Sequence, residues 1–555
     1  MEKNKTDFQI LVQLLYQYAW KFSEIRIMII PSIASVIVSK MLFVQSSKYI
    51  RKITSAVGNH SVKINMIIHY GLCIFSNVVL GELCSLYTCK AGHIGYTIAS
   101  KRAYEYFLLL YPGDFNKIGK GEMQNTIQRY SEAVKDILDV LTLIIMPFIA
   151  TVLISLISIM PILGPLAVFV IMLTVCLYII ATVKITIWRN QYKIKINKNT
   201  DKTQNVLNDG LNNFEVIYTL GTEINEVTRY NKCLLQVQSS NLVFDRARYC
   251  LNMVQGFIWS LQLFLLISVQ CLIIKMDKPE DITFILSIIS MFHTSLNNLG
   301  FMYGKYKTGM INIRQTNLPI RKMKSEGFRK VSILKEQIAV YDLSFGYNNK
   351  VVLDCASFII KKGEKIAVVG ENGSGKSTLL KSLIKYNESD AQIFIDEYNS
   401  DDICDKSYRN LITYVPQNAT LFDETILYNI KYGNNSVYDE QIFKMAHLLG
   451  IHDSITRLEQ GYNTLCGENG SALSGGERQK VTILRALMRN SSVLLMDEPT
   501  ANMDKKSELK ILESINKIED LTVVSIIHNH NLLHLYNRIL KVENGKVTSL
   551  SGPIN

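Results

Sequence analysis

A glycine-rich loop follows a short apolar run in EKIAVVGENGSGKSTLL, residues 364–380. Its spacing, G-x-x-x-x-G-K-S from Gly370 to Ser377, lets backbone N–H groups surround phosphate oxygens where a helix begins. Lys376 adds a cation suited to β- and γ-phosphates, and the Ser377 hydroxyl suits Mg²⁺. The loop therefore predicts nucleotide binding. We expect the phosphate cradle to comprise Gly370, Asn372, Gly373, Ser374, Gly375, Lys376, Ser377 and Thr378.

Two adjacent carboxylates end a second hydrophobic run, SVLLMDEPT at residues 492–500. Asp497 has the chemistry of a Mg²⁺ ligand, and Glu498 has that of a group that orients or deprotonates an attacking water. A third segment, LSGGERQK at 473–480, places a serine and two glycines where a helix is expected to begin. Such a helix N-terminus favours phosphate. We expect the phosphate ligands there to be Ser474, Gly475 and Gly476.

These residues are the signature of the ABC ATPases, which the chain resembles in full and in order over about residues 335–550. The resemblance implies ATP and Mg²⁺ as cofactors, with Tyr347 of FGYNNK stacked on adenine. Asp504 of ANMD resembles the loop that crosses a dimer interface, and His528 after VVSII resembles the switch histidine at the γ-phosphate. The implied catalytic set is Glu498, His528 and Gln417, and the implied Mg²⁺ ligands are Ser377, Gln417 and Asp497.

Two single residues near these motifs have alternative interpretations. His530 lies two positions after His528, and we prefer His528 because it directly ends the apolar strand. Cys466 precedes GENG at 467–470, which resembles the exporter loop that senses coupling helices, and we expect this cysteine to fill space rather than act as a redox switch. Since both carboxylates and the switch histidine are present, we expect a competent hydrolase.

A basic pair closes a long apolar run in TVKITIWRNQYKIK, residues 182–195. Arg189 and Lys193 lie four residues apart and share one face of any helix that carries them. In isolation, such a pair favours an anchor at the membrane interface. The alternative is that the cations bind an anion that the protein moves.

The elements that must position these residues begin with six apolar segments, each long enough to cross a bilayer core. The first two are weaker, because Arg26, Lys40, His69 and Glu82 interrupt them. Ionisable groups at such depth usually face a bundle interior or a wet cavity. Buried helices of a soluble protein are the less favoured alternative. The six segments span about residues 25–46, 63–87, 138–160, 162–187, 251–275 and 281–304.

The linkers between these segments predict the topology. A tight turn near Pro161 and the short KMDKPED separate neighbouring segments, whereas the linkers at about 88–137 and 188–250 are long and helix-prone. The long linkers must therefore emerge on the same side as the C-terminal domain, and the run WRNQYKIKINKNTDK makes that side basic. Coupling helices are expected near 111–121 and 207–215.

We predict a membrane α-helical bundle of six transmembrane helices, of the ABC exporter type, fused to an α/β P-loop ABC ATPase domain. The expected domains are an N-terminal elbow at 1–22, a transmembrane domain at 23–320, a linker at 321–334 and a nucleotide-binding domain at 335–555. The net charge of +12 does not indicate nucleic acid as a partner, because the cations flank apolar runs. Ten cysteines without a CxxC pair argue against a disulfide scaffold or a zinc site.

The family resemblance also implies a dimer. In ABC ATPases the serine–glycine signature of one domain closes on the phosphate loop of another. Because one chain supplies one of each, we expect a C₂ homodimer, and a heterodimer with another chain stays open.

The run at 188–223 resembles one subgroup, the mitochondrial half-transporters for iron–sulfur biogenesis and their bacterial glutathione-exporting relatives. TIQRYSEAVKDILDVLTLIIMPF at 126–148 and SLNNLGFMYGKYK at 295–307 agree. Glutathione carries two carboxylates, which cations and amides at one depth suit. Lys193 stands where the subgroup has a second arginine, so it keeps the charge but loses bidentate geometry. The implied substrate residues are Arg189, Lys193, Asn252, Gln255 and Asn297.

The expected function is ATP-driven export of a glutathione-linked or sulfur-containing compound for iron–sulfur cluster biogenesis, by a homodimeric half-transporter in the lipid bilayer. By resemblance, the membrane is the mitochondrial inner membrane or that of a mitochondrion-derived organelle, with a bacterial plasma membrane as the alternative. A mitochondrial presequence is not visible, which leaves import into an ordinary mitochondrion unexplained, and a mitochondrion-derived organelle with shortened targeting signals would accommodate its absence. Two rival functions remain: a general drug, lipid or peptide exporter, and a non-transporting regulatory ABC protein.

Overall fold

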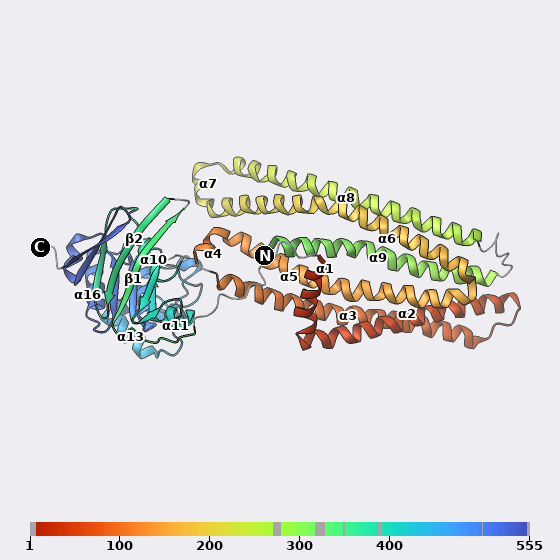
Figure 1. Ribbon diagram of the computed structural model, residues 1–555, viewed down its shortest axis with the longest axis horizontal. Helices are drawn as coiled ribbons and strands as arrows, with labels where there is room; N and C mark the ends of the chain where they lie inside the picture. The colour runs from red at the N-terminus through yellow and green to blue at the C-terminus, as the bar shows by residue number, and fades with distance from the viewer. Residues whose placement is uncertain are drawn as a thin grey trace. The chain divides into compact units, whose positions relative to one another are not determined.

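A computed structural model of the protein describes residues 7–110, 112–269, 279–316, 328–347, 350–386, 391–501 and 503–551. The chain forms two compact units (Figure 1). The first comprises Met1–Leu110 and Asn116–Arg321 and is helical, and the second comprises Tyr111–Phe115 and Lys322–Asn555 and contains the strands. The predicted linker at 321–334 lies partly outside the described residues.

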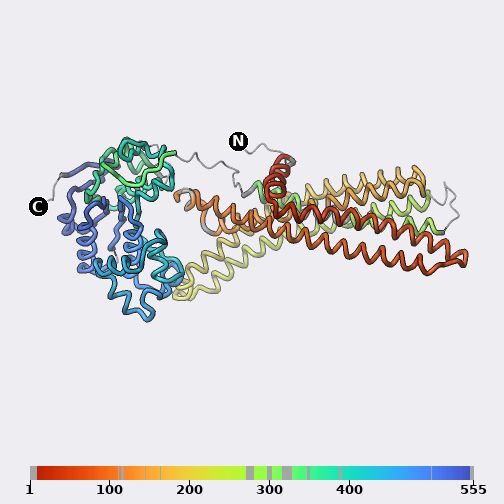
Figure 2. Tube along the Cα trace, turned by 90° about the horizontal axis from the view of Figure 1, so that it is seen from below, coloured from red at the N-terminus to blue at the C-terminus, as the bar shows by residue number. Residues whose placement is uncertain are grey.

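Long helices lie side by side in the first unit (Figures 1 and 2). They are α2 (Ser23–Gly58), α3 (Ile64–Leu108), α5 (Lys120–Val140), α6 (Met146–Asn212), α8 (Glu223–Ser268) and α9 (Pro279–Thr316). The shorter elements are α1 (Asp7–Leu14), the π-helix η1 (Leu15–Trp20), the π-helix η2 (Leu141–Ile145) and α7 (Phe214–Leu220). The short helix α4 (Pro112–Ile118) is divided between the two units. The two long linkers predicted as helix-prone are thus continuations of α3, α5, α6 and α8.

The boundary between the third and fourth predicted spans lies at Gly164. Its φ of +78° interrupts helical geometry inside α6, between Pro161 and Pro165, and a glycine adopts this conformation without the strain that a Cβ would bring. The predicted turn near Pro161 is therefore three residues further along the chain. The coupling helix expected at 207–215 straddles the end of α6, and the separate short helix begins at Phe214.

Five helical segments among the described residues are long and apolar enough to cross a membrane. They are Ser23–Gly58, Ile64–Leu108, Gly121–Ile162, Gly164–Asn212 and Glu223–Ser268. The sixth predicted span lies on α9, a helix of 38 residues that is not among these five. Polar contacts join the helices, for example Ser32 to Thr88 at 2.8 Å and Ser47 to Ser287 at 2.7 Å. Such contacts help bundles to associate in lipid, where apolar burial alone supplies little drive.

The second unit is built on two sheets. The six-stranded sheet has the order β10-β9-β3-β8-β7-β6, and the four-stranded sheet has the order β2-β1-β4-β5. The strands are β1 (Gln337–Tyr347), β2 (Lys350–Lys361), β3 (Lys365–Val369), β4 (Gln392–Ile395), β5 (Tyr398–Asn399), β6 (Ile412–Val415), β7 (Val493–Asp497), β8 (Thr522–Ile526), β9 (Arg538–Glu543) and β10 (Lys546–Ser551). The helices are α10 (Lys376–Leu383), α11 (Asp405–Leu411), α12 (Ile426–Lys431), α13 (Asp439–Leu448), α14 (His452–Thr456), α15 (Gly475–Met488) and α16 (Lys505–Asn516).

The parallel strands β3, β8, β7 and β6 position the chemistry. Ile366 of β3 packs in the core on one face of the sheet, and its neighbour Ala367 packs in the core on the other. Because both faces are covered, these strands read as continuous apolar runs rather than alternating ones. Their carboxyl ends lie along one edge of the sheet. The phosphate loop, the Asp–Glu pair, His528 and Gln417 all follow these four strand ends.

Candidate functional site

The phosphate loop turns sharply between β3 and α10. Gly373 and Gly375 have φ values of +81° and +105°, and a Cβ at Gly375 would lie 3.1 Å from Val352 Cγ1. Glycine is therefore required at Gly375 by both backbone conformation and space. Lys376 is only 6% exposed, and its Nζ donates to the carbonyl oxygens of Gly370 and Glu371, each at 2.9 Å. These two bonds hold the ammonium group against the loop.

Ser377 and Asp497 meet at the end of β7. The Ser377 hydroxyl donates to Asp497 Oδ1 at 3.0 Å, and the Tyr414 hydroxyl donates to Asp497 Oδ2 at 2.9 Å. Asp497 is 3% exposed, so its two oxygens are held by these partners rather than by bulk water. Hard oxygen donors of this kind, a hydroxyl and a carboxylate, suit Mg²⁺, which takes one or two carboxylates and completes its shell with water and phosphate oxygens. The residues present thus fit the metal that the sequence predicts.

Glu498 receives a partner on each carboxylate oxygen. Gln417 Nε2 donates to Oε2 at 2.7 Å, and His528 Nε2 lies 2.5 Å from Oε1. Glu498 also has a φ of +47°, which is uncommon for a residue with a side chain and persists only where the surrounding structure holds it. His530 instead begins a short 3₁₀-helix, His530–Leu535. Of the two histidines, His528 is the one that contacts Glu498, and its role at the γ-phosphate stays a prediction.

The serine–glycine segment forms the N-terminus of α15, with Ser474 as the N-cap and Gly475 and Gly476 in the first turn. Glu477 closes a capping box: its Oε2 accepts from the Ser474 backbone N–H at 2.8 Å and from the Ser474 hydroxyl at 2.6 Å. Glu477 was not among the predicted residues, although the Ser-x-x-Glu spacing before a helix indicates a capping box. Tyr414 was also missed, and nothing in its local sequence marks its bond to Asp497.

Other predicted residues of the ATP site lie apart from these contacts. Asp504 is the N-cap of α16, where its Oδ2 accepts from the Ser507 N–H at 2.9 Å, and this bonding with Ser507 lowers the pKa of the exposed Asp504 carboxyl. Tyr347 ends β1, but its side chain lies outside the described atoms. Cys466 is buried, and Asn429 Nδ2 donates to its Sγ at 3.5 Å.

In the helical unit, Arg189 of α6 is buried at 6% exposure. Its Cζ lies 4.8 Å from the ring centroid of Phe244 on α8, and Gly304 of α9 lies against its guanidinium. Among the described residues Arg189 has no hydrogen bond and no ion pair within 4 Å, and its Nε is buried without a partner. Asp245 and Arg248 of α8 act on its charge from farther away. Arg189 was predicted from the sequence, but Phe244 and Gly304 were not.

The other predicted substrate residues are placed differently. Lys193 is half-buried one turn after Arg189, and Asn252 is exposed on α8. Gln255 is 5% exposed and donates from Nε2 to Thr182 Oγ1 at 3.0 Å, so its amide nitrogen already joins α8 to α6. Asn297 lies on α9, and its side chain is outside the described atoms.

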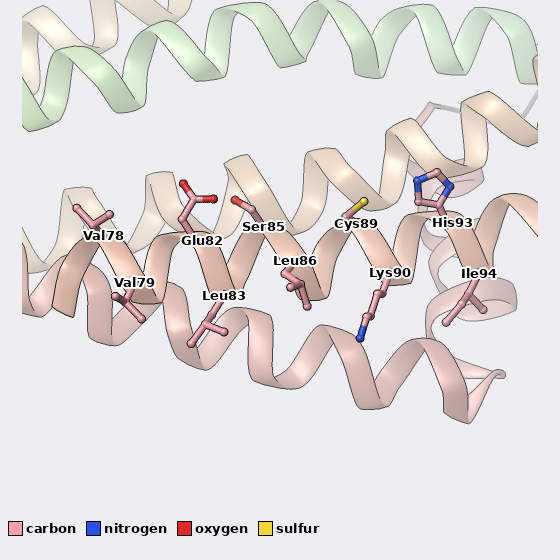
Figure 3. A pocket seen from close by; sticks show the side chains of 10 residues that line it. All are labelled: Val78, Val79, Glu82, Leu83, Ser85, Leu86, Cys89, Lys90, His93 and Ile94. Atoms are coloured by element: carbon pink, nitrogen blue, oxygen red, sulfur yellow. The ribbon is translucent and has the colours of Figure 1, made fainter. Parts of the chain in front are cut away.

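A separate hollow of about 890 Å³ runs along one face of α3 (Figure 3). None of the predicted substrate residues lines it. Its lining residues are Val78, Val79, Glu82, Leu83, Ser85, Leu86, Cys89, Lys90, His93 and Ile94.

Comparison with known families accounts for both units. The ABC transporter model matches residues 353–501, and the ABC transporter transmembrane region model matches residues 25–296. The chain belongs to the ABC transporter family. It is a multi-pass membrane protein that carries an ABC ATPase domain, which confirms the predicted fold class.

This ABC transporter has relatives among characterised proteins. It is 32% identical to the mitochondrial iron–sulfur clusters transporter ABCB7 of Oryzias latipes, over 67% of this chain and 52% of that protein. It is 27% identical to the mitochondrial iron–sulfur clusters transporter ATM1 of Candida albicans, over 97% of this chain and 77% of that protein. A heavy metal tolerance protein of Schizosaccharomyces pombe is 31% identical over 68% of this chain and 46% of that protein. The chain thus spans about half the length of the ABCB7 relative.

A solved structure shares the fold of this ABC transporter. A bacterial Atm1-family ABC exporter with ATP bound superposes with a TM-score of 0.88 over 95% of each chain, at 24% sequence identity. At that identity the likeness shows the fold, a helical exporter bundle joined to an ATPase domain.

Proposed function

We propose that the chain is half of an ATP-driven exporter whose cargo is a glutathione-linked or other sulfur-containing anion, moved for iron–sulfur cluster biogenesis across a mitochondrial-type membrane. The observation that carries the cargo assignment is Arg189, a cation that is 6% exposed in the helical unit and has no hydrogen bond or ion pair among the described residues. A buried charge that no group contacts directly is costly. Asp245 of α8 offsets part of that cost from beyond 4 Å, and an anionic ligand in direct contact would offset more. The names of the ABCB7 and ATM1 relatives support the same assignment.

The ATPase residues have distinct roles in this proposal. Backbone N–H groups of the phosphate loop and Lys376 bind the β- and γ-phosphates. The oxygen atoms of Ser377, Asp497 and Gln417 would hold Mg²⁺, which when bound would offset the charge of the triphosphate.

Hydrolysis proceeds by attack of a water oxygen on the γ-phosphorus, with rupture of the bond to the β–γ bridging oxygen. Glu498 accepts the proton that the water loses. His528 Nε2, which lies 2.5 Å from Glu498 Oε1, positions that carboxylate, and contact between His528 and the γ-phosphate is part of the proposal.

Two copies of the chain form the working unit. Each chain carries one phosphate loop and one serine–glycine N-terminus, Ser474–Gly476. A pair of chains related by a twofold axis supplies two complete ATP sites. ATP binding draws the two ATPase domains together and turns the substrate cavity outward, and hydrolysis resets it.

The cargo assignment replaces the anchor interpretation of Arg189. An anchoring arginine keeps its head group at the polar interface, whereas this side chain is packed against Phe244 and Gly304. A glutathione carboxylate would pair with the guanidinium in a forked geometry. Lys193, one turn away, would add charge without that geometry.

The test is the ATPase activity of the protein reconstituted in lipid nanodiscs, with reduced glutathione, oxidised glutathione and a panel of hydrophobic drugs. We expect a glutathione compound to stimulate hydrolysis and the drugs to have no effect. Arg189→Ala should abolish the stimulation, and Arg246→Ala, which removes an exposed cation from α8, should retain it. Stimulation by drugs alone would identify a general exporter, and ATP binding without hydrolysis under any condition would identify a regulatory protein.

The anchor interpretation makes its own prediction. If neutralising both Arg189 and Lys193 lowers the fraction of protein that inserts into the membrane, while the inserted protein keeps its glutathione-stimulated hydrolysis, the pair is an anchor and the cargo assignment is wrong.

A further inference from the structure

Three helices converge on the Arg189 guanidinium, and two of the contacts come from residues without charge. Phe244 of α8 places its ring centroid 4.8 Å from Cζ. On α9, Gly304 presents only backbone: a Cβ built there would lie 3.1 Å from Arg189 Cζ and closer still to Nη2. The guanidinium therefore occupies space that any side chain at Gly304 would take.

We propose that Phe244 and Gly304 are positioning residues that hold the Arg189 guanidinium as a preformed receptor for a carboxylate. The inference rests on the proposed function in one respect, that Arg189 contacts an anionic cargo. It adds Phe244 and Gly304 as residues that determine specificity, and it identifies the group of the cargo that contacts Arg189 as a planar anion.

The chemistry of each contact supports this assignment. An aromatic face attracts a cation through its quadrupole, and the attraction grows when water is excluded. A ring that covers the flat face of a guanidinium leaves its N–H edge free, and that edge matches a carboxylate in a bidentate pair. Nε of Arg189 is buried and has no hydrogen-bond partner among the described residues, so one donor of the guanidinium remains unsatisfied.

The rigidity of the Arg189 side chain affects how tightly the site binds a carboxylate. An arginine side chain loses considerable rotamer freedom when a ligand immobilises it. Packing against Phe244 and the bare backbone at Gly304 removes that freedom before the ligand arrives. A displaced guanidinium would keep its charge, but its N–H groups would point in a different direction, and binding a carboxylate would cost more side-chain entropy.

The experiment measures the glutathione concentration that gives half-maximal ATPase stimulation, together with basal and maximal rates, in nanodiscs. Gly304→Ala should raise that concentration about tenfold, because the new methyl group pushes the flexible end of Arg189 aside while the backbone stays in place. Phe244→Leu should raise it about tenfold as well, the equivalent of losing a desolvated cation–π contact. Phe244→Tyr, which keeps the ring, should stay within about twofold.

Matched controls separate positioning from general damage. Gly81→Ala makes the same substitution on α3, where an added Cβ meets nothing within 4 Å. Phe264→Leu makes the same substitution on α8 at a ring that is 67% exposed. Both should leave the half-maximal concentration unchanged. If Gly304→Ala also lowers basal activity, the comparison of Phe244→Leu with Phe244→Tyr decides whether the residues around Arg189 have a positioning role.

The outcomes distinguish this inference from the proposed function. If Arg189→Ala leaves glutathione stimulation unchanged, the cargo assignment itself fails. If Arg189→Ala abolishes stimulation but Gly304→Ala and Phe244→Leu keep the parental half-maximal concentration, the cargo assignment stands and the positioning role is overturned. A rise for Phe244→Tyr as large as that for Phe244→Leu would also overturn the role of the ring.

Discussion

Replacement of Glu498 by glutamine removes the proposed base and leaves its surroundings nearly intact. Glutamine has the same shape, and its amide oxygen can still accept from Gln417 Nε2, which now lies 2.7 Å from Oε2. Its amide nitrogen would face His528 Nε2, which lies 2.5 Å from Oε1, and the neutral imidazole can accept that bond. The exchange therefore removes charge and basicity while the contacts are largely kept.

The expected loss follows from the role of the carboxylate. A positioned general base contributes about 10²- to 10⁴-fold in rate, or roughly 2.7–5.4 kcal/mol of barrier. We expect Glu498→Gln to lower ATP hydrolysis by at least about 100-fold. ATP affinity should be retained, because Lys376 and the phosphate loop are untouched.

The assay is phosphate release by the reconstituted protein, with equilibrium ATP binding measured on the same sample. Glu459→Gln, at an exposed carboxylate elsewhere in the ATPase unit, is the matched control and should hydrolyse at the parental rate. If Glu498→Gln binds ATP and still hydrolyses it within about threefold of the parent, Glu498 is not the base.

Three further predictions concern the ATPase unit. Gly375→Ala should weaken ATP affinity more than about tenfold in equilibrium binding, because φ at Gly375 is +105° and Val352 Cγ1 lies 3.1 Å from the new Cβ. Gly433→Ala is the control and should leave ATP affinity unchanged, because its new Cβ meets Arg489 at an ordinary distance of 3.6 Å. Burial raises the pKa of the Cys466 thiol, so iodoacetamide should alkylate it more slowly at neutral pH than it alkylates the exposed Cys355. Mass spectrometry measures both rates, and equal rates would contradict the buried environment of Cys466. Burial lowers the pKa of Lys365 from 10.5 to about 8, so the folded state binds fewer protons than the unfolded state between these values. The unit should therefore gain stability as pH rises through that window, and in thermal unfolding Lys365→Met should lose this part of the pH slope.

Much of the ATP site could be predicted from the sequence, because each motif is a local backbone event. A strand, a glycine turn and a helix start lie within one short segment, and the residue types fix where phosphate can approach. The cross-strand contacts could not be predicted in the same way. Asp497 meets Ser377 and Tyr414 only because β3, β7 and β6 share one sheet edge.

In the helical unit, what the sequence predicts and what only the tertiary structure shows are more clearly separated. The apolar runs predicted the helices, since a bilayer requires a minimum length of apolar chain. They did not predict that Gln255 would bond Thr182 rather than stay free for a ligand. A helix period shows which residues share a face, but not which neighbouring helix that face meets.

The sequence by itself therefore determined that this chain joins a membrane bundle to an ABC ATPase, and where the phosphate-binding residues stand. Only the tertiary structure decided the state of Arg189. Its burial at 6% exposure, against Phe244 and the bare backbone of Gly304, depends on α6, α8 and α9 meeting at one depth. Phe244 and Gly304, which supply those contacts, lie 55 and 115 residues after Arg189. A local sequence pattern does not predict contacts between residues so far apart in the chain. That convergence turns a cation at the end of an apolar run into a candidate receptor for an anion.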